Sequence, residues 1–331
     1  MNSHPAQVRA IHPSPAARFH QAAVFFIIAL CLVTLVPRVG ATSVYLDENY
    51  PGLTPRLYAP GQVSRADRFR QNFTMTRDGN EVLFTETTGA DWDYRAIVRL
   101  KRDAQGHVSE DVPPALRDPK FEHRPFIGEP CLSPDGNTLL FVGDFPPDIW
   151  MCRRTGGGEW GAPVKLGGGV NSPEAEWYPS LAADGTLFFC SKRSGQPLWY
   201  QADPTADGWG NVRLLDAPFN RNSGGDLAVS PDGTCVVYQA MRPGNAGEGD
   251  LYASFREANG RWSAEISLGA SVNTAGFDFG PSFSPDGKYL FFSRRDKWQA
   301  ATSSAIYWVS TELLRSLKPA ALGKVTLANR G

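Results

Sequence analysis

Short apolar runs flank five copies of an Asp-Gly pair along the chain. One run precedes each pair, and a second begins two to four residues after its glycine. Two apolar runs around such a pair are typical of a β-hairpin, because Asp and Gly adopt the backbone angles that a tight turn requires. The five pairs are Asp78-Gly79, Asp135-Gly136, Asp184-Gly185, Asp232-Gly233 and Asp286-Gly287.

The hairpins recur at intervals of 57, 49, 48 and 54 residues, and other segments recur with them. A third apolar stretch follows each hairpin, and three units continue through a glycine-containing turn, a tryptophan and a fourth short stretch. Four short strands in a unit of about 50 residues are typical of a β-propeller blade. The sequence therefore predicts an all-β fold, a β-propeller of four-stranded blades. The recurring tryptophans are Trp160, Trp209 and Trp262, and the recurring loop asparagines are Asn171, Asn220 and Asn273.

Five units predict five blades, with six blades as the alternative. A sixth blade would need residues 102–126, which are long enough for a strand and a loop but contain no Asp-Gly hairpin. The fifth unit lacks a fourth strand, whereas residues 54–64 near the N-terminus resemble one. We therefore expect residues 53–59 to pair with the third strand of the last unit and close the ring, which removes two exposed strand edges.

The N-terminal region has the pattern of a secretory signal. Residues 22–36 are one uninterrupted apolar run, Arg9 and Arg18 precede it, and small residues follow it up to Ala41. This order of charge, apolar run and small residues predicts cleavage after Ala41. The alternative is an uncleaved membrane anchor, although the run is shorter than the roughly 20 residues that a membrane span needs.

These features divide the chain into three parts. We expect a signal peptide (1–41), a single propeller domain (42–318) with its repeats in about residues 65–310, and a C-terminal tail (319–331). Export would place the protein in the periplasm or outside the cell, whereas an uncleaved N-terminal segment would anchor it to a membrane. We expect no membrane span after cleavage, and we expect a monomer.

The repeated phrases resemble those of a known family. SPDG followed by an apolar run, as in residues 133–141 and 284–292, occurs with Asp148-Ile149-Trp150 and with loops such as residues 166–172. These motifs are similar to the WD40-like repeats of the TolB-type β-propeller family over roughly residues 53–310. The resemblance implies an exported propeller that binds another macromolecule or ligand. TolB itself carries a separate α/β domain before its propeller, whereas here about a dozen residues separate the predicted cleavage site from the closing strand.

Charge and motif content argue against several function classes. The 33 Lys and Arg residues are balanced by 34 Asp and Glu residues, so the chain has no basic surface for nucleic acid. Only His107 and His123 lie beyond the N-terminal region, and two histidines do not make a histidine-rich zinc site. The motifs of a serine-hydrolase elbow, a phosphate-binding loop and a zinc protease do not occur. We therefore assign no catalytic residue, no metal and no cofactor.

Four cysteines lie after the predicted signal, in strand positions that are not equivalent between units. An oxidising compartment would permit disulfides. We expect these thiols instead to pack as small buried apolar groups. They are Cys131, Cys152, Cys190 and Cys235.

The first strand of each propeller blade lines the central channel, so the residues before each Asp-Gly pair are candidate site residues. Alternate residues share one face of a strand, and we expect four acids and one arginine to converge at one end of the channel. Position −6, counted back from each aspartate, holds Asn72, Glu129, Tyr178, Asp226 and Gly280. Position −8 holds Arg70, Ile127, Glu176, Gly224 and Asp278.

A ring of this kind would bind a cation or sugar hydroxyls, or supply an acid/base pair. The alternative is that the acids are solvated or accept hydrogen bonds from loop amides. Trp177 would either stack on a sugar ring or pack between blades. The candidate binding residues are Arg70, Asn72, Glu129, Glu176, Trp177, Tyr178, Asp226 and Asp278.

Two functions follow from these observations. The first is a non-catalytic, exported binding module for a protein or a cell-envelope polymer such as a polysaccharide. The alternative is a small carbohydrate-active hydrolase or lyase that uses the carboxylates at the channel mouth. The sequence favours the binding module, because no separate catalytic domain remains once the repeats are placed.

Overall fold

The computed structural model describes residues 45–47, 49–87, 95–117, 127–220, 225–299 and 301–318. The chain divides into two compact units, residues 1–41 and 42–331, and the first contains no described residue. The predicted signal peptide and C-terminal tail lie outside the described residues, so their limits stay predictions. No helix among the described residues is long and apolar enough to cross a membrane.

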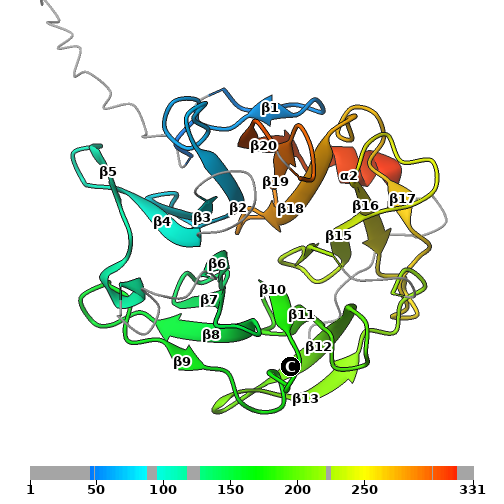
Figure 1. The fold of residues 1–331 in the computed structure, drawn as a ribbon, viewed down its shortest axis with the longest axis horizontal. Helices are drawn as coiled ribbons and strands as arrows, with labels where there is room; N and C mark the ends of the chain where they lie inside the picture. The colour runs from blue at the N-terminus through cyan, green and yellow to red at the C-terminus, as the bar shows by residue number, and fades with distance from the viewer. Residues whose placement is uncertain are drawn as a thin grey trace, which may run out of the picture. The chain divides into compact units, whose positions relative to one another are not determined.

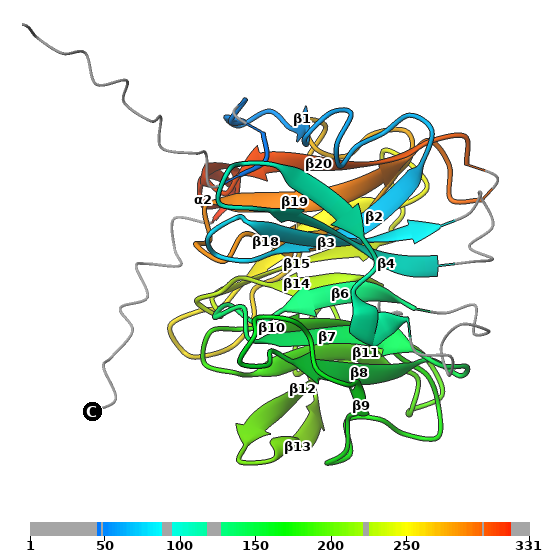
Figure 2. The same ribbon diagram turned by 90° about the vertical axis from the view of Figure 1, so that its left-hand side faces the viewer.

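The described strands form antiparallel four-stranded units arranged around a common centre (Figure 1, Figure 2). The first strands of units 1 to 5 are β2 (Phe69–Met75), β6 (Gly128–Leu132), β10 (Glu176–Leu181), β14 (Leu227–Val229) and β18 (Phe277–Phe283). The second strands are β3 (Glu81–Thr87), β7 (Thr138–Gly143), β11 (Leu187–Ser191), β15 (Cys235–Ala240) and β19 (Tyr289–Arg295).

The third and fourth strands complete each unit toward the outside. The third strands are β4 (Arg95–Arg102), β8 (Asp148–Arg153), β12 (Leu198–Thr205), β16 (Asp250–Phe255) and β20 (Ser304–Ser310). The fourth strands are β5 (Val108–Asp111), β9 (Val164–Lys165), β13 (Gly208–Leu214), β17 (Ile266–Ser267) and, for unit 5, β1 (Arg56–Leu57). The all-β propeller fold with four-stranded sheets is confirmed. Units 2, 3 and 4 are separate four-stranded sheets, and the strands of units 1 and 5 join in one eight-stranded sheet, so the count of five blades stays a prediction.

Each Asp-Gly pair closes the turn between the first and second strands, as the sequence predicted. In unit 2 the Asp135 carboxylate accepts hydrogen bonds from the Ser133 hydroxyl (2.5 Å) and from the backbone N–H of Asn137 (3.0 Å). Gly136 has a φ of +73°, a conformation that costs glycine little and other residues more. The repeated aspartates therefore act as turn formers.

The N-terminal segment closes the ring. β1 pairs with β20, the third strand of the last unit, with Arg56 opposite Trp308 and Leu57 opposite Tyr307. The predicted pairing of this segment with the third strand of the last unit is confirmed at these two residues. Tyr58, Phe73 and Trp308 are buried in one aromatic cluster that joins this segment to units 1 and 5, with ring centroids about 5 Å apart. α2 (Glu312–Leu317) and the short helix η1 (Pro114–Leu116) lie outside the sheets.

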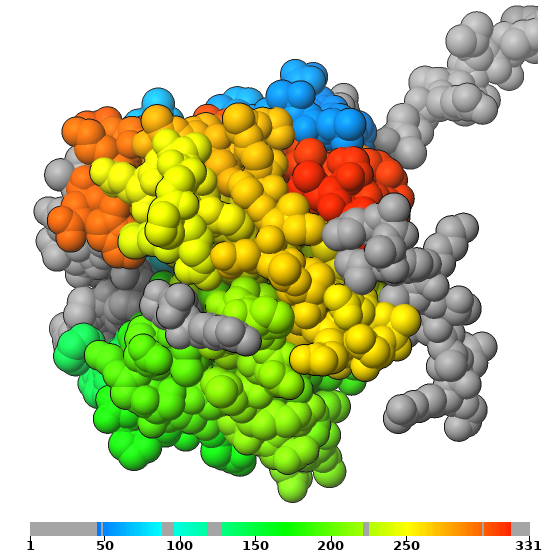
Figure 3. Space-filling model, turned by 90° about the vertical axis from the view of Figure 1, so that its right-hand side faces the viewer, coloured from blue at the N-terminus to red at the C-terminus, as the bar shows by residue number. Residues whose placement is uncertain are grey.

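The core consists of apolar clusters that each span neighbouring units. The recurring tryptophans contribute to them, since Trp160 and Trp262 are buried among residues of the preceding unit. Figure 3 shows units 3 and 4, coloured green and yellow, in contact along one side of the molecule. The four cysteines among the described residues form no disulfide with one another, and all except the half-buried Cys131 are buried, as expected.

The recurring loop asparagines hold the connections between units. The side-chain oxygen of Asn220 accepts a hydrogen bond from the backbone N–H of Trp199 (2.9 Å), and its amide group donates to the carbonyl of the same residue (2.8 Å). Asn171 and Asn273 bind the backbone of Ile149 and Leu251 in the same way. These asparagines are therefore structural, and they fix the point at which each third strand begins.

Candidate functional site: the central cavity

The first strands of the units lie toward the centre of the molecule (Figure 1). All five contribute residues to the lining of a cavity of about 70 Å³. Each unit contributes its residue at position −6 to the lining, so the structure brings together Asn72, Glu129, Tyr178, Asp226 and Gly280. This volume is well below the roughly 300 to 1,000 Å³ of ordinary ligand sites.

A β-bulge turns the −6 residue of most units toward the cavity. In units 1, 2, 3 and 5 this residue has a left-handed backbone, with φ between 51° and 57°. At the same point the pairing of the first strand with the second shifts its register. A bulge interrupts the alternation of side chains along a strand. Positions −6 and −8 therefore do not share a face there, and none of the described −8 residues lines the cavity.

Two carboxylates of the cavity bind the backbone of the next unit. An oxygen of Glu129 accepts a hydrogen bond from the backbone N–H of Tyr178 (2.9 Å). An oxygen of Asp226 accepts one from the backbone N–H of Gly280 (2.5 Å). Both side chains are buried, and both amides belong to −6 residues of the following unit. Each acid thus joins two neighbouring units.

Hydroxyl groups make the same connection at two other junctions. The backbone N–H of Glu129 donates to the hydroxyl of Thr85 in unit 1 (2.8 Å), and the N–H of Asn72 donates to the hydroxyl of Ser293 in unit 5 (2.9 Å). Thr85 and Ser293 are second-strand residues, each directly opposite position −7 of its own unit. Neither of these two bridging residues is among the candidates that the sequence predicts.

Unit 2 shows why a carboxylate rather than a hydroxyl accepts this hydrogen bond at some junctions. The residue of unit 2 equivalent to Thr85 is Val142, which lies opposite Gly128 and has no hydrogen-bonding side chain. Glu129, at position −6 of the same unit, supplies the acceptor that Val142 lacks. In unit 4 the position seven residues after the turn aspartate holds Gln239, and Asp226 supplies the acceptor. Comparing these two columns of the repeat would have revealed the substitution of acid for hydroxyl.

The charged residues at position −8 form ion pairs inside their own units. Arg70 binds Glu86 on the adjacent strand at 2.8 Å, and Asp278 binds Arg294 at 2.6 Å. In both units the two partners lie directly opposite one another, with the charges exchanged between strands. Arg70 and Asp278 are completely buried. The charges that the sequence predicted at the channel mouth are therefore neutralised by partners within their own units.

The remaining candidates at positions −8 and −7 belong to unit 3. Glu176 is completely buried and accepts hydrogen bonds from the hydroxyls of Ser172 and Ser191, both at 2.6 Å. Its carboxylate also lies 3.4 Å from the guanidinium of Arg193. Trp177 is half-buried against the apolar cluster between units 3 and 4. Neither side chain lines the central cavity.

The thiols near the cavity are poor nucleophiles. Burial raises the pKa of Cys131, which lines the cavity, to about 12. Burial also raises the pKa of Cys190, and the nearby carboxylates of Glu129 and Asp226 raise it further. A thiol reacts as its thiolate, so both groups are unreactive at neutral pH. No cluster of three or more potential metal ligands occurs among the described residues.

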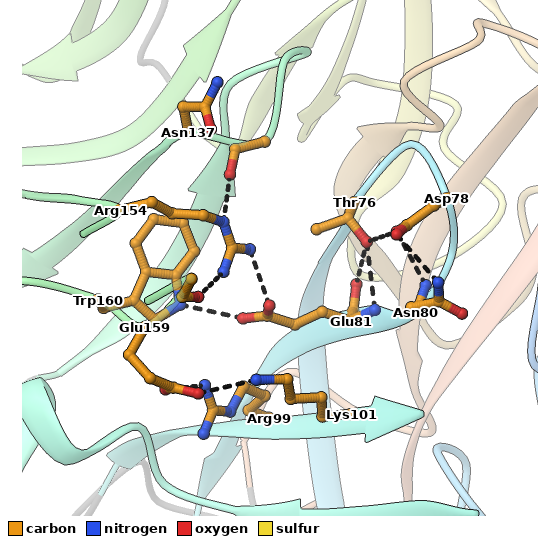
Figure 4. A network of polar contacts seen from close by, with 12 residues as sticks. Thr76, Asp78, Asn80, Glu81, Arg99, Lys101, Asn137, Arg154, Glu159 and Trp160 are labelled. Atoms are coloured by element: carbon orange, nitrogen blue, oxygen red, sulfur yellow. Dashed lines mark hydrogen bonds and ion pairs between the residues drawn. The ribbon is translucent and has the colours of Figure 1, made fainter. Parts of the chain in front are cut away.

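A second polar network joins units 1 and 2 outside the central cavity (Figure 4). Glu81 of β3 accepts hydrogen bonds from the guanidinium of Arg154 (2.7 Å) and from the indole N–H of Trp160 (3.0 Å). Glu159 binds Arg99 (2.7 Å) and Lys101 (2.8 Å). Hydrogen bonds from Lys101 and Arg99 lower the pKa of Glu159 to about 2. This network is an ion-paired contact between two units.

Comparisons with known proteins give structural likenesses only. No family model matches the chain, and no curated protein matches it. A protein of Agrobacterium tumefaciens provisionally identified as TolB has a TM-score of 0.45 at 18% identity, over 69% of this chain and 71% of that one. TolB of Acinetobacter baumannii gives 0.43 at 17% identity, over 73% of this chain and 55% of that one, so the match spans about half of that protein. An α-L-arabinofuranosidase of Lactobacillus brevis gives 0.44 at 14% identity, over 74% and 90%.

Proposed function

We propose that the protein is an exported, TolB-like β-propeller that acts as a non-catalytic binding module for a protein or a cell-envelope polymer. The observation that carries this proposal is the use of the channel acids. Glu129 and Asp226 each accept a backbone hydrogen bond from the next unit, beside a cavity of about 70 Å³. A glycosidase needs two carboxylates on either side of a bound sugar. The cavity is several times smaller than ordinary ligand sites.

One face of the propeller has the features of a binding surface. The described loops between the second and third strands emerge on the same face, because consecutive strands run antiparallel. Three of these loops expose a large apolar side chain: Phe145 is 81% exposed, Met241 57% and Trp298 39%. Aromatic residues and methionine are enriched in protein interfaces. We infer that this loop face, defined by these three residues, contacts the partner.

The loop that carries Phe145 is held firmly by its neighbours. Lys165 forms ion pairs with Asp148 and with Asp144 (3.5 Å) on either side of the exposed ring. The carbonyl of Pro147 accepts a hydrogen bond from the backbone N–H of Glu176 in unit 3 (2.8 Å). An apolar side chain on a fixed loop binds with a smaller loss of conformational entropy than one on a free loop.

A capture experiment tests the proposal. The mature protein would be immobilised and incubated with the cell-envelope fraction of its source, beside a Phe145→Ser, Met241→Ser double variant. Val164→Ser is the matched control, because Val164 is 57% exposed but lies on the outer strand β9. We expect the double variant to lose the captured component and the control to keep it.

Two results would overturn the proposal. One is equal capture by the double variant and the wild type. The other is turnover of a polysaccharide by the purified protein that Glu129→Gln or Asp226→Asn abolishes. That second result would establish the hydrolase or lyase function instead, because both substitutions keep an acceptor oxygen for the neighbouring amide.

A further inference from the structure

The junction between units 1 and 2 and the junction between units 3 and 4 share one design. In each, a tryptophan beyond the third strand is buried against the preceding unit: Trp160 in the first junction and Trp262 in the second. A charged residue comes immediately before each tryptophan. It is Glu159 at the first junction and Arg261 at the second.

At the first junction the charged residue is neutralised. Glu159 binds Arg99 and Lys101 of the preceding unit, which face it from strand β4 (Figure 4). Arg99 is in turn held by both oxygens of Asp111, each 2.8 Å from a guanidinium nitrogen. The junction is therefore closed by ion pairs within the chain.

At the second junction the charged residue has no partner. Strand register makes Gln201 and Asp203 of unit 3 the equivalents of Arg99 and Lys101. Asp203 is already ion-paired with Arg213 at 2.8 Å. Within the part of the chain that the structure describes, the guanidinium of Arg261 has no ion pair and no hydrogen bond, and it is exposed.

A pocket of about 440 Å³ lies beside Arg261 at the outer end of β13. Its walls include the apolar side chains of Leu214, Pro218 and Trp262, and Leu214 is 48% exposed. Asp216 also lines the pocket and, among the described residues, binds no other side chain. The volume falls within the range of ordinary ligand sites, about 300 to 1,000 Å³.

We propose that this pocket binds a segment of a partner protein that presents an aliphatic side chain beside a carboxylate. The aliphatic group packs against Leu214 and Pro218, and the carboxylate pairs with Arg261. A carboxylate also pairs with basic side chains at the junction between units 1 and 2. There both sides belong to this chain, since Glu159, just before the tryptophan, pairs with Arg99 and Lys101. An arginine and a carboxylate form strong, directional hydrogen bonds. None of the three residues that define the loop face lines this pocket, so this inference does not depend on the proposed function.

Short peptides test the pocket by NMR. The probes are the capped peptides acetyl-Gly-Leu-Glu-Gly-amide and its counterparts with Gln or Lys in place of Glu. Binding is followed through the indole N–H signal of Trp262, which Trp262→Phe identifies by its loss. We expect the Glu peptide to bind about fivefold more tightly than the Gln peptide, the difference expected for one added hydrogen bond. The Lys peptide should bind most weakly.

A charge reversal separates recognition from a general effect. Arg261→Glu should reverse the order, so that the Lys peptide binds most tightly. Arg56→Glu is the matched control, since Arg56 is also exposed but lies on β1. It should leave the order unchanged. A melting curve checks that each variant is folded, and if Arg261→Glu does not fold, Arg261→Gln must remove the preference for Glu over Gln.

Three results would overturn this proposal. The first is no change in the Trp262 signal with any of the peptides. The second is the same order of affinities in wild type and Arg261→Glu, or a reversal that Arg56→Glu also produces. The third is a change in the Trp262 signal with chitotetraose, a neutral oligosaccharide, when the peptides give none, because the pocket would then recognise a polymer rather than a protein.

Discussion

At four junctions around the central cavity, the backbone amide at position −6 finds its acceptor in two different ways. Between units 1 and 2, and between units 5 and 1, a second-strand hydroxyl accepts the hydrogen bond, from Thr85 and Ser293 respectively. Between units 2 and 3, and between units 4 and 5, a first-strand carboxylate accepts it, from Glu129 and Asp226. The hydrogen bonds have similar lengths, but a hydroxyl suggests a structural role whereas a carboxylate in a channel suggests a binding or catalytic one.

This difference gives two of the channel carboxylates a structural role. A buried amide without an acceptor is costly, so each junction must supply one. Where the second strand cannot, as at Val142, an acid on the first strand does. The resulting carboxylates face the cavity because the bulged strand places position −6 there. Acids at the centre of this propeller therefore connect its units.

Removing a carboxylate bridge should give the largest effect. Asp226→Ala leaves the backbone N–H of Gly280 without the acceptor that it has in the wild type. We expect the free energy of unfolding to fall by about 2 to 3 kcal/mol, because the bond to a charged group is lost inside the protein. Urea unfolding measures this change. Asp226→Asn, which keeps an acceptor oxygen, is the control and should lose less than half as much.

Removing a hydroxyl bridge should cost less. Thr85→Val keeps the shape of the side chain but deprives the backbone N–H of Glu129 of its acceptor. We expect a loss of about 1 kcal/mol in the free energy of unfolding, the usual contribution of a neutral hydrogen bond. The same urea titration measures it. If Thr85→Val lost as much stability as Asp226→Ala, charged and neutral bridges would not differ as proposed.

The ion pairs of Glu159 outside the cavity should have the smallest effect. Its pKa in the folded protein is about 2, below the ordinary 4.5, so its stabilisation is complete above pH 4.5 and is lost as the pH falls toward 2. The side chain is 45% exposed, and solvent limits the contribution to about 0.5 kcal/mol.

The test of this ion pair is the difference in unfolding free energy between wild type and Glu159→Gln, measured at several pH values. The difference should be present at pH 7 and disappear near pH 2. It should also shrink in 1 M salt, which shortens the range of charge interactions to about 3 Å. A difference that persists unchanged at pH 2 would show that Glu159 acts through packing instead.

Much of the fold follows from local patterns in the sequence. The turns were predictable because Asp-Gly pairs and their flanking residues determine a hairpin within a few residues, as at Asp135. The closing strand was predictable because the last unit lacks a fourth strand and residues 54–64 resemble one. Both features depend on short stretches or on counting repeats, and the structure agrees with each.

The site was harder to predict because it depends on contacts between units. Regular alternation along a strand put Arg70 and Asp278 at the channel mouth, but the bulge at position −6 removes them from the cavity lining. The partner of Glu129 is a backbone amide in another unit, which no side-chain pattern records. Among the described residues, Arg261 is left without a partner in the pocket because Asp203, the nearest equivalent of Lys101, is already paired with Arg213.

A rescue experiment tests the role of the channel acids most directly. Glu129→Ala removes the acceptor for the amide of Tyr178, and Val142→Thr adds a hydroxyl at the position that Thr85 occupies in unit 1. The measurement is the free energy of unfolding of the single and double variants. We predict that the double variant recovers at least half of the stability that Glu129→Ala loses. If Val142→Thr restores nothing in the Glu129→Ala background, Glu129 does not substitute for a bridging hydroxyl, and the account is wrong.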